Sequence, residues 1–492
     1  MTVTLDIMAH AGFIGIDQGS SSTKAVVIDT DGTIVFRDRK ELPAPFREGP
    51  RVEQDPAEIL ASVRHVLYAC AKYARSSGLA VLGIGLSCQR SSCLIWNEAS
   101  GEPLSPVLSW RDTRGHDVVN RLSDRSELIF GKTGLPLTPY YAASKFLWLK
   151  DHHPAAGHDQ TVFGTLSSFL VQRLTEGRRA VVDHANAART QLMDIQALTW
   201  DEELTALFGL SGIKLPELRP TTDAFGTVRT PEGDIPLCAC VGDQQAAMIG
   251  LGVLEKGDGG INYGTGGFLM VNTGNELVRA QALMSSVLYS TQGEKCYLLE
   301  GSVNAVGDSL EWLRTRLGLF SVYDEVDDLC WKATTDVVAF IGLNGTGAPH
   351  WETGISSSLH GMTEESAAAD IVRGTVECAA FFMKDIAEEM RRAGVEASRY
   401  SLAGGLSSLS YLVQIQADLL GKELRVSSEQ EVSARGAALL AGMQQGAWSP
   451  KSIKDISLPG ETVSAGKNPV AEKRYRRWRE LHRMTGILDR MP

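Results

Sequence analysis

Two carboxylates, Asp17 and Asp243, each follow an apolar run and precede a polar turn. Asp17 opens the stretch DQGSSSTK, in which a glycine is followed by hydroxyl residues and a lysine. A turn of small residues lets backbone N–H groups approach phosphate oxygens closely, and the hydroxyls and Lys24 would add donors and charge. A carboxylate repels phosphate, but Asp17 can hold Mg²⁺ that bridges phosphate oxygens, usually through water. For this stretch alone, the alternative is a polar hairpin without a ligand.

Asp243 lies in CVGDQQ, between a predicted strand and a predicted helix. At such a junction a carboxylate can accept the proton of a substrate hydroxyl while that oxygen attacks the γ-phosphorus of a nucleotide. Gln244 would hydrogen-bond a neighbouring hydroxyl. The alternative is that Asp243 only caps the helix that follows it.

Two more turns combine glycine with hydroxyl residues. NYGTGGF places Thr265 among glycines, and AGGLSSLS places two glycines and several hydroxyls just before a predicted helix. Free N–H groups and the helix dipole favour phosphate at such a position. Neither turn is a Walker A loop, and GxGxxG does not follow Gly264 because the position of its last glycine holds Leu269. Three such turns along the chain predict a nucleotide held in a cleft.

A third group of residues predicts a pocket for a polyhydroxy compound. Gln89 and Arg90 end a predicted strand and can address hydroxyls. Trp110, Tyr140 and Phe268 offer flat apolar faces to the C–H side of a polyol. The alternative is a set of core aromatic residues with a surface arginine, and it is strongest for Tyr140.

The elements that must position these residues fall into two successive halves. Strands are predicted at GFIGID and TKAVVID, with TDG as the next turn, and a helix is predicted from Pro56 with Asp55 as its N-cap. Strand, small-residue turn and strand recur in GGINYGTGGFLMVNTG, and a long amphipathic helix is predicted over 367–393. The repetition favours a duplicated α/β domain, with chance similarity of two glycine-rich hairpins as the alternative.

The predicted domains are residues 1–252, with the first turn and the pocket, and residues 253–450, with the nucleotide turns. Residues 451–492 predict a helical tail packed on the second domain, because Tyr475 and Trp478 recur at helical spacing among basic residues. The basic face of this tail is expected to lie in solvent.

Composition excludes several classes of protein. The chain has 492 residues, of which 43% are hydrophobic and 22% charged, as in ordinary globular enzymes. Its net charge of -11 disfavours nucleic acid as a partner. No run of 18 apolar residues and no basic leader occurs, so neither a membrane span nor a secretion signal is predicted. The eight cysteines form no CxxC pair, which indicates reduced thiols in a cytoplasmic protein.

Together these motifs resemble the FGGY carbohydrate kinases, and among them most closely the glycerol kinases. Ordered matches run from DQGSSSTKAVVID through SWRDTR, TPYYAASK, GDQQAAMIG, NYGTGGF and GLNGTGAPHW to GAALLAG. The resemblance implies an α/β fold of two actin-like (ribonuclease-H-like) domains flanking a nucleotide/substrate cleft. It implies phosphorylation of a hydroxyl of a small polyol or sugar with ATP and Mg²⁺. An actin- or chaperone-type ATPase without sugar phosphorylation is the alternative, and whether the chain forms a homo-oligomer is left open.

By position, the resemblance implies a role for each candidate residue. Asp243 corresponds to the catalytic base, and Asp17 and Asp243 correspond to the carboxylates that hold Mg²⁺ through water. The positions implied to bind the nucleotide are Asp17, Gly19, Ser20, Ser21, Ser22, Lys24, Thr265, Gly266, Gly307, Gly404, Gly405 and Ser408. Those implied to bind the polyol are Gln89, Arg90, Trp110, Tyr140, Asp243, Gln244 and Phe268.

Four positions depart from the glycerol kinases. Ser91 stands where they carry Glu, which removes a strong acceptor for a hydroxyl and leaves room for a different or longer polyol. Lys24 replaces Arg, which keeps the charge without the bidentate geometry. Glu311 stands for Gln, and Ala403 for the Asp before the glycine pair. The identity of the polyol or sugar is therefore left open.

Overall fold

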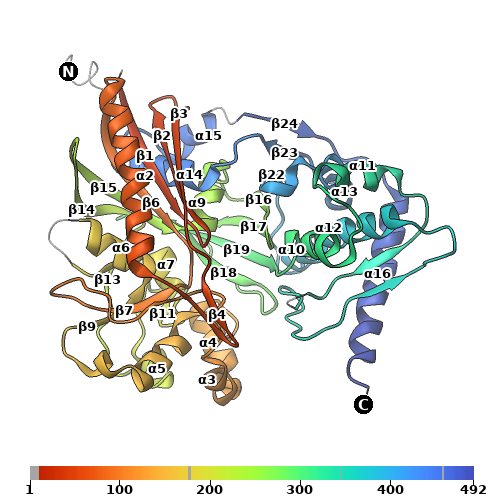
Figure 1. Ribbon diagram of the computed structural model, residues 1–492, viewed down its shortest axis with the longest axis horizontal. Helices are drawn as coiled ribbons and strands as arrows, with labels where there is room; N and C mark the ends of the chain where they lie inside the picture. Colours follow the sequence, from red (N-terminus) through yellow and green to blue (C-terminus); the bar gives the residue numbers. More distant parts are fainter. Residues whose placement is uncertain (1–9, 176–178, 344, 457–458, 492) are drawn as a thin grey trace.

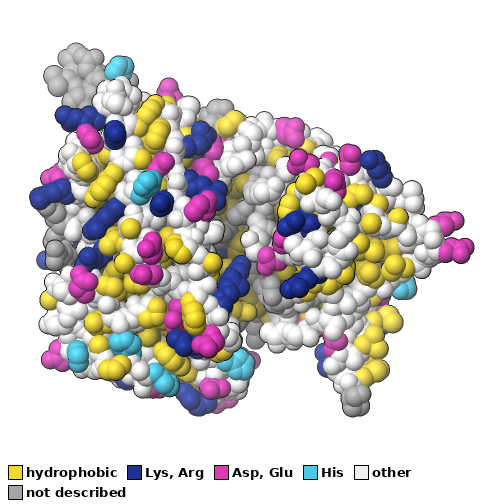
Figure 2. Space-filling view, in the orientation of Figure 1, with side chains coloured by type: hydrophobic (Ala, Val, Ile, Leu, Met, Phe, Trp, Pro, Cys, Tyr) yellow, Lys and Arg dark blue, Asp and Glu magenta, His cyan; other side chains and the backbone are white. Residues whose placement is uncertain are grey.

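The computed structural model describes residues 10–175, 179–343, 345–456 and 459–491, and it folds into two lobes (Figure 1). In the space-filling view the surface is hollowed between these lobes (Figure 2). The first lobe is built on a six-stranded sheet with the order β14 (Thr222–Thr230), β15 (Gly233–Gly242), β6 (Ala80–Cys88), β1 (Ala11–Gln18), β2 (Ser22–Asp29) and β3 (Ile34–Glu41). The second is built on a seven-stranded sheet with the order β18 (Met284–Ser290), β19 (Lys295–Val303), β17 (Gly267–Gly274), β16 (Asp258–Tyr263), β22 (Arg399–Ala403), β23 (Leu424–Ser427) and β24 (Gly460–Val463).

The two sheets share one arrangement of strands. In the first, β1 is antiparallel to β2 on one side and parallel to β6 on the other, and β6 is parallel to β15. In the second, β16 is antiparallel to β17 on one side and parallel to β22 on the other, and β22 is parallel to β23. The prediction of two actin-like α/β domains is confirmed, and the repeated glycine turn joins the corresponding strands of each copy. The boundaries at residues 252 and 450 stay a prediction.

Smaller sheets and helices complete the lobes. A five-stranded sheet in the lower part of the first lobe (Figure 1) has the order β4 (Phe46–Glu48), β5 (Arg51–Gln54), β8 (Val107–Leu108), β7 (Cys93–Asn97) and β9 (Thr161–Thr165). Three two-stranded sheets pair β10 (Val181–Asp183) with β13 (Glu217–Arg219), β11 (Met193–Asp194) with β12 (Thr199–Trp200), and β20 (Val338–Phe340) with β21 (Ser358–His360). Further helices are α3 (His116–Arg121), α4 (Ser126–Thr133), α5 (Ala142–His152), α6 (Leu166–Leu174), α7 (His184–Ala188), α8 (Glu202–Leu207), α10 (Gly307–Trp312), α11 (Asp324–Lys332) and α13 (Ser410–Leu420).

Several local predictions are confirmed. Asp55 caps α2 (Pro56–Ser76) by accepting a hydrogen bond from the backbone N–H of Ala57 at 2.7 Å. The long amphipathic helix is α12 (Ala368–Arg392). All eight cysteines are buried free thiols. No helix in the described ranges combines the length and apolar character that crossing a membrane requires.

Residues 451–492 contain a strand as well as helices. After α15 (Pro450–Asp455), β24 pairs antiparallel with β23, so the tail is not helical throughout. In α16 (Pro469–Leu488), Tyr475 and Trp478 are buried in the core of the second lobe. The expectation of a wholly solvated basic face is wrong for Arg474, which is buried and donates to the Glu377 carboxylate at 2.7 and 2.9 Å.

Helices α9 (Asp243–Gly250) and α14 (Val432–Gln444) pack against each other beside the first sheet. Although α14 comes late in the sequence, it packs on β1 and β6 of the first sheet. A Cβ added at Gly436 would lie 1.9 Å from the carbonyl oxygen of Ala246, and one added at Gly15 would lie 1.8 Å from that of Ala434. Only glycine allows so close a main-chain approach, so these elements touch backbone to backbone.

Replacing Gly15 with Ala is expected to reduce the free energy of unfolding by about 1–3 kcal/mol. The new methyl group would clash with the backbone of Ala434, which cannot move away as a side chain could. Urea unfolding followed by circular dichroism measures this change. The matched control is Gly131→Ala in α4, where nothing lies within 4 Å of the added Cβ. An equal loss of stability in both variants contradicts the close contact.

Candidate active site

The first-half site residues meet at one edge of the first sheet. Because β1, β6 and β15 are parallel and paired in register, the residues at and just beyond their carboxyl ends are neighbours. These residues are Asp17, Gln89, Arg90, Asp243 and Gln244. The structure therefore joins both predicted carboxylates to part of the predicted polyol pocket.

The carboxylates of Asp17 and Asp243 influence each other's charge. Burial and the charge of Asp243 raise the pKa of Asp17 to about 7, although Ser87 Oγ donates to Asp17 Oδ1 at 2.9 Å. Burial also raises the pKa of Asp243, and this is opposed by Arg90, whose Nε lies 3.3 Å from Asp243 Oδ1. Two close carboxylates in a buried site favour a divalent cation beside them.

Asp243 does not occupy the N-cap position of α9. That position is held by Gly242, and Asp243 Oδ1 accepts a hydrogen bond from the adjacent backbone N–H of Gln244, at 2.8 Å. Its side chain keeps 29% of its surface exposed. A ligand in the cleft can therefore reach this carboxylate.

Glu300 of β19 reaches Arg90 from the second sheet. The two terminal nitrogens of Arg90 donate to the Glu300 carboxylate at 2.9 and 3.0 Å. Arg189 donates to the same carboxylate at 2.6 and 2.5 Å, and Ser286 Oγ does so at 3.0 Å. Burial alone would raise the pKa of Glu300, but Arg189 and Arg90 hold it at about 2. An ionised Glu300 thus fixes Arg90 between itself and Asp243.

Sequence reasoning missed Glu300 and Arg189 as site residues. Their only local signal is a single charge inside an apolar run, in CYLLEGSV and in ANAARTQL. Buried charges are paired in folded proteins, so each lone charge indicates a partner without naming it.

Trp110 and Ser20 form one wall of the site. Trp110 Nε1 donates to Ser20 Oγ at 3.1 Å, and Ser20 Oγ donates to Gln89 Oε1 at 3.1 Å. Ser20 was expected at the phosphate, whereas its hydroxyl here faces the substrate residues. Gln89 is 3% exposed, and its Nε2 donates hydrogen bonds to Gln18 Oε1 and Gln54 Oε1, both at 3.1 Å. Gln89 is therefore a buried residue that holds Ser20 in place.

The remaining pocket residues come from separate segments. Tyr140 precedes α5 and, like Trp110, is 37% exposed, so neither ring is a core residue. Phe268 of β17 places its ring centroid 5.7 Å from the guanidinium carbon of Arg90. Gln244 Oε1 accepts a hydrogen bond from Asn262 Nδ2 at 3.2 Å. Both lobes therefore contribute to the pocket.

The turn after β16 and the start of α10 are held together by main-chain hydrogen bonds. The N–H of Gly307 donates to the carbonyl of Gly264 at 3.1 Å, and the N–H of Val306 donates to that of Thr265 at 2.9 Å. A Cβ at Gly266 would lie 2.7 Å from the carbonyl oxygen of Val303. The structure thus brings together Thr265, Gly266 and Gly307, three of the positions that the family resemblance implies for the nucleotide.

The glycine pair after β22 lies next to this turn, because β22 and β16 are parallel with Ala403 opposite Asn262. Gly404 has φ 103°, and a Cβ there would lie 2.2 Å from the carbonyl oxygen of Tyr263, so only glycine fits. Gly405 faces open space. Ser408 Oγ donates to the Gly405 carbonyl at 3.0 Å, within its own turn.

In the turn between β1 and β2, the backbone N–H of Gly19 donates to the carbonyl of Ser22 at 3.0 Å. Ser21 is exposed, while Ser22 is buried at the start of β2. Lys24, expected at the phosphate, instead pairs with Glu431, with Nζ 3.0 Å from the carboxylate. Glu431 immediately precedes α14, so this ion pair ties the turn to the helix crossing.

Comparison with known proteins assigns both halves of the chain. The N-terminal domain of the FGGY family of carbohydrate kinases matches residues 13–250, and the C-terminal domain of that family matches residues 259–445. A glycerol kinase of Streptococcus agalactiae is 31% identical over 490 residues, covering 96% of this chain and 97% of that protein.

Solved structures give the same assignment of fold. Plasmodium falciparum glycerol kinase with ADP superposes with a TM-score of 0.89 at 29% identity, covering 97% of this chain and 98% of the other. A xylulose kinase from Rhodospirillum rubrum superposes with a TM-score of 0.87 at 21% identity, covering 97% and 99%. The second likeness concerns the fold alone.

Proposed function

Because this chain belongs to the FGGY family of carbohydrate kinases and is an ATP-dependent kinase of a polyol or sugar, we propose that Asp243 is its catalytic base. The observation that carries this proposal is the position of Asp243: reachable from the cleft, next to Asp17, and 3.3 Å from an arginine that Glu300 holds in place. A general base must lie within reach of the proton that it removes.

Asp243 accepts the proton of the substrate hydroxyl while the oxygen attacks the γ-phosphorus. Arg90 opposes the rise in the pKa of Asp243 that burial causes, and this favours the ionised form of the base. The ring faces of Trp110 and Tyr140 pack against the carbon skeleton of the substrate. Backbone N–H groups of the turn at Gly405 and of the turn that follows Gly19, whose own N–H donates to Ser22, receive the phosphates.

The residues present suit Mg²⁺. Among the described residues no group of three His, Cys, Asp or Glu side chains converges, so the protein offers no complete cage. Mg²⁺ keeps several waters and binds through one or two carboxylates plus substrate phosphates. Asp17 and Asp243 would hold it through water. When bound, it neutralises charge on the phosphates.

The size of the substrate depends on Ser91. This residue follows Arg90, is 8% exposed and has φ 65°, in the left-handed region. Serine has a shorter side chain than the glutamate that glycerol kinases carry at this position, and it brings no carboxylate next to Arg90. We expect a polyol or ketose longer than glycerol to be the preferred substrate.

Ser91→Glu is expected to raise kcat/KM for glycerol about tenfold relative to kcat/KM for a five-carbon substrate, because the carboxylate adds an acceptor and fills space. Steady-state rates with glycerol and D-xylulose measure the ratio. Ser91→Ala, which removes the hydroxyl without adding charge, should leave the ratio unchanged. A parallel change for both substrates contradicts the assignment.

The function is tested by coupled ADP release with glycerol, erythritol, ribitol and D-xylulose in turn. Release that requires one of these compounds supports the proposed pocket. Release that is independent of all of them supports the ATPase alternative.

A further inference from the structure

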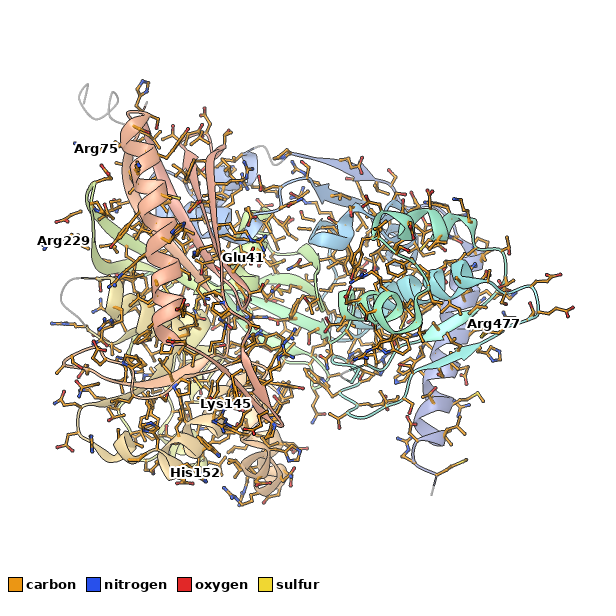
Figure 3. The ribbon with its side chains drawn as sticks, in the orientation of Figure 1. Glu41, Arg75, Lys145, His152, Arg229 and Arg477 are labelled. Atoms are coloured by element: carbon orange, nitrogen blue, oxygen red, sulfur yellow. The ribbon has the colours of Figure 1, made fainter. Side chains whose placement is uncertain are left out.

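Lys145 in α5 is a buried cation that the mechanism above does not use. Its side chain is 0% exposed, and Figure 3 shows it in the lower part of the first lobe. Nζ donates to the carbonyl oxygens of Ser91 at 3.0 Å, Ser109 at 3.0 Å and Tyr140 at 2.8 Å. An ammonium group has three N–H donors, so all of them are used.

The three carbonyls belong to three separate segments that border the pocket. Ser91 follows β6, Ser109 follows β8 and precedes Trp110, and Tyr140 precedes α5. The carbonyls of Ser91 and Tyr140 belong to pocket residues, and the carbonyl of Ser109 belongs to the residue before Trp110. A single ammonium group thus sets the distances between three parts of the pocket wall.

No carboxylate pairs with Lys145 in the part of the chain that the structure describes. Asp112 lies near it, but the Asp112 carboxylate already accepts hydrogen bonds from Arg114 at 2.9 and 2.7 Å and from the backbone N–H of Val52 at 2.8 Å. Burial lowers the pKa of Lys145, which is the cost of keeping a charge there. A methionine would fill the same space without that cost. What the ammonium group adds is therefore the hydrogen bonding of the three carbonyls.

We propose that Lys145 is a positioning residue that fixes Ser91, Trp110 and Tyr140 at the spacing that the polyol requires. This inference rests on the pocket assigned under Proposed function. The nucleotide turns belong to other segments, so Lys145 acts on the binding of the polyol and not on that of ATP.

Lys145→Met is expected to raise KM for the polyol about tenfold or more, because three buried carbonyls lose their donor and the segments shift. KM for ATP should change less than about threefold. The probe is whichever of glycerol, erythritol and D-xylulose the wild-type protein phosphorylates best. The matched control is Lys150→Met in the same helix, because Lys150 donates to one carbonyl, that of Gly209, at 2.7 Å near the surface. Equal increases of both KM values, or none, overturn the proposal.

If Lys145→Met does not fold, the pH dependence of KM in the wild-type protein tests the role of Lys145. Loss of a proton from Lys145 removes one of its three donors, so KM for the polyol in the wild-type protein should rise on an alkaline limb with a midpoint below the ordinary lysine value of 10.5. The other groups beside Lys145 are Asp112, Arg114 and Cys93, and burial raises the pKa of Cys93 to about 11. Cys93→Ala should retain the limb. A wild-type KM for the polyol that stays flat up to pH 10.5 overturns the proposal.

Trp110→Ala distinguishes a failure of the proposed polyol pocket from a failure of the proposed role of Lys145. If it leaves KM for the polyol unchanged, the assignment of the pocket fails. If it raises KM while Lys145→Met does not, the pocket stands and the role of Lys145 is refuted.

Discussion

Asp243→Asn is expected to lower turnover by about 10²–10⁴-fold while the polyol still binds. Asparagine keeps the size of the side chain but cannot accept the proton of the attacking hydroxyl at neutral pH. The ion pair with Arg90 at 3.3 Å is lost as well, although Glu300 continues to hold that arginine through two hydrogen bonds. Coupled ADP release gives the turnover number, and calorimetric titration with the polyol gives its affinity.

The matched control for this variant is Asp201→Asn. Asp201 caps α8 by accepting a hydrogen bond from the backbone N–H of Leu204 at 2.8 Å, and it lies outside the pocket. If Asp243 were only a helix cap, the two variants would have similarly small effects on turnover. A near-normal rate for Asp243→Asn refutes its role as the base.

Glu300→Gln is expected to reduce the free energy of unfolding by about 3–5 kcal/mol, because two buried guanidinium groups lose their shared counter-charge. The carboxylate is 1% exposed, so water cannot replace it. Arg90 is then attracted by Asp243 alone, which lowers the pKa of that carboxylate and weakens the base. Chemical denaturation measures the stability, and the rate at saturating substrate measures the effect on the base.

Glu311→Gln makes the same substitution in an exposed ion pair. Glu311 accepts hydrogen bonds from Arg314 at 2.7 and 3.0 Å, and its side chain is 43% exposed. Exposed pairs contribute about 0–1 kcal/mol, so its stability should change little. Equal small losses in both variants would mean that Glu300 is not the essential counter-charge of the two arginines.

The meeting of Asp17 and Asp243 at one edge of the first sheet was predictable because it depends on local pattern and strand direction. Asp17 and Asp243 each end an apolar run before a turn, and parallel strands bring such ends together. The same reasoning located the glycine turn at Thr265. Each of these residues can be recognised from its position within its own segment of the sequence.

The partners that come from distant segments were not predictable in this way. Arg90 and Glu300 are separated by 210 positions, and Lys145 bonds carbonyls up to 54 positions away. Nothing in the local sequence says which buried charges meet. The pairing of Lys24 with Glu431 was unpredictable for the same reason, because the sequence does not show that α14 packs on the first sheet.

The backbone contact between α9 and α14 fixes the position of Asp243 relative to the first sheet. Asp243 is the first residue of α9, and α14 is pressed against that helix at Gly436 and Gly250. Because α14 also packs on β1, the strand that carries Asp17, both carboxylates belong to one close-packed unit. A displacement of α9 would change the distance between these two carboxylates, and the close main-chain contacts oppose it.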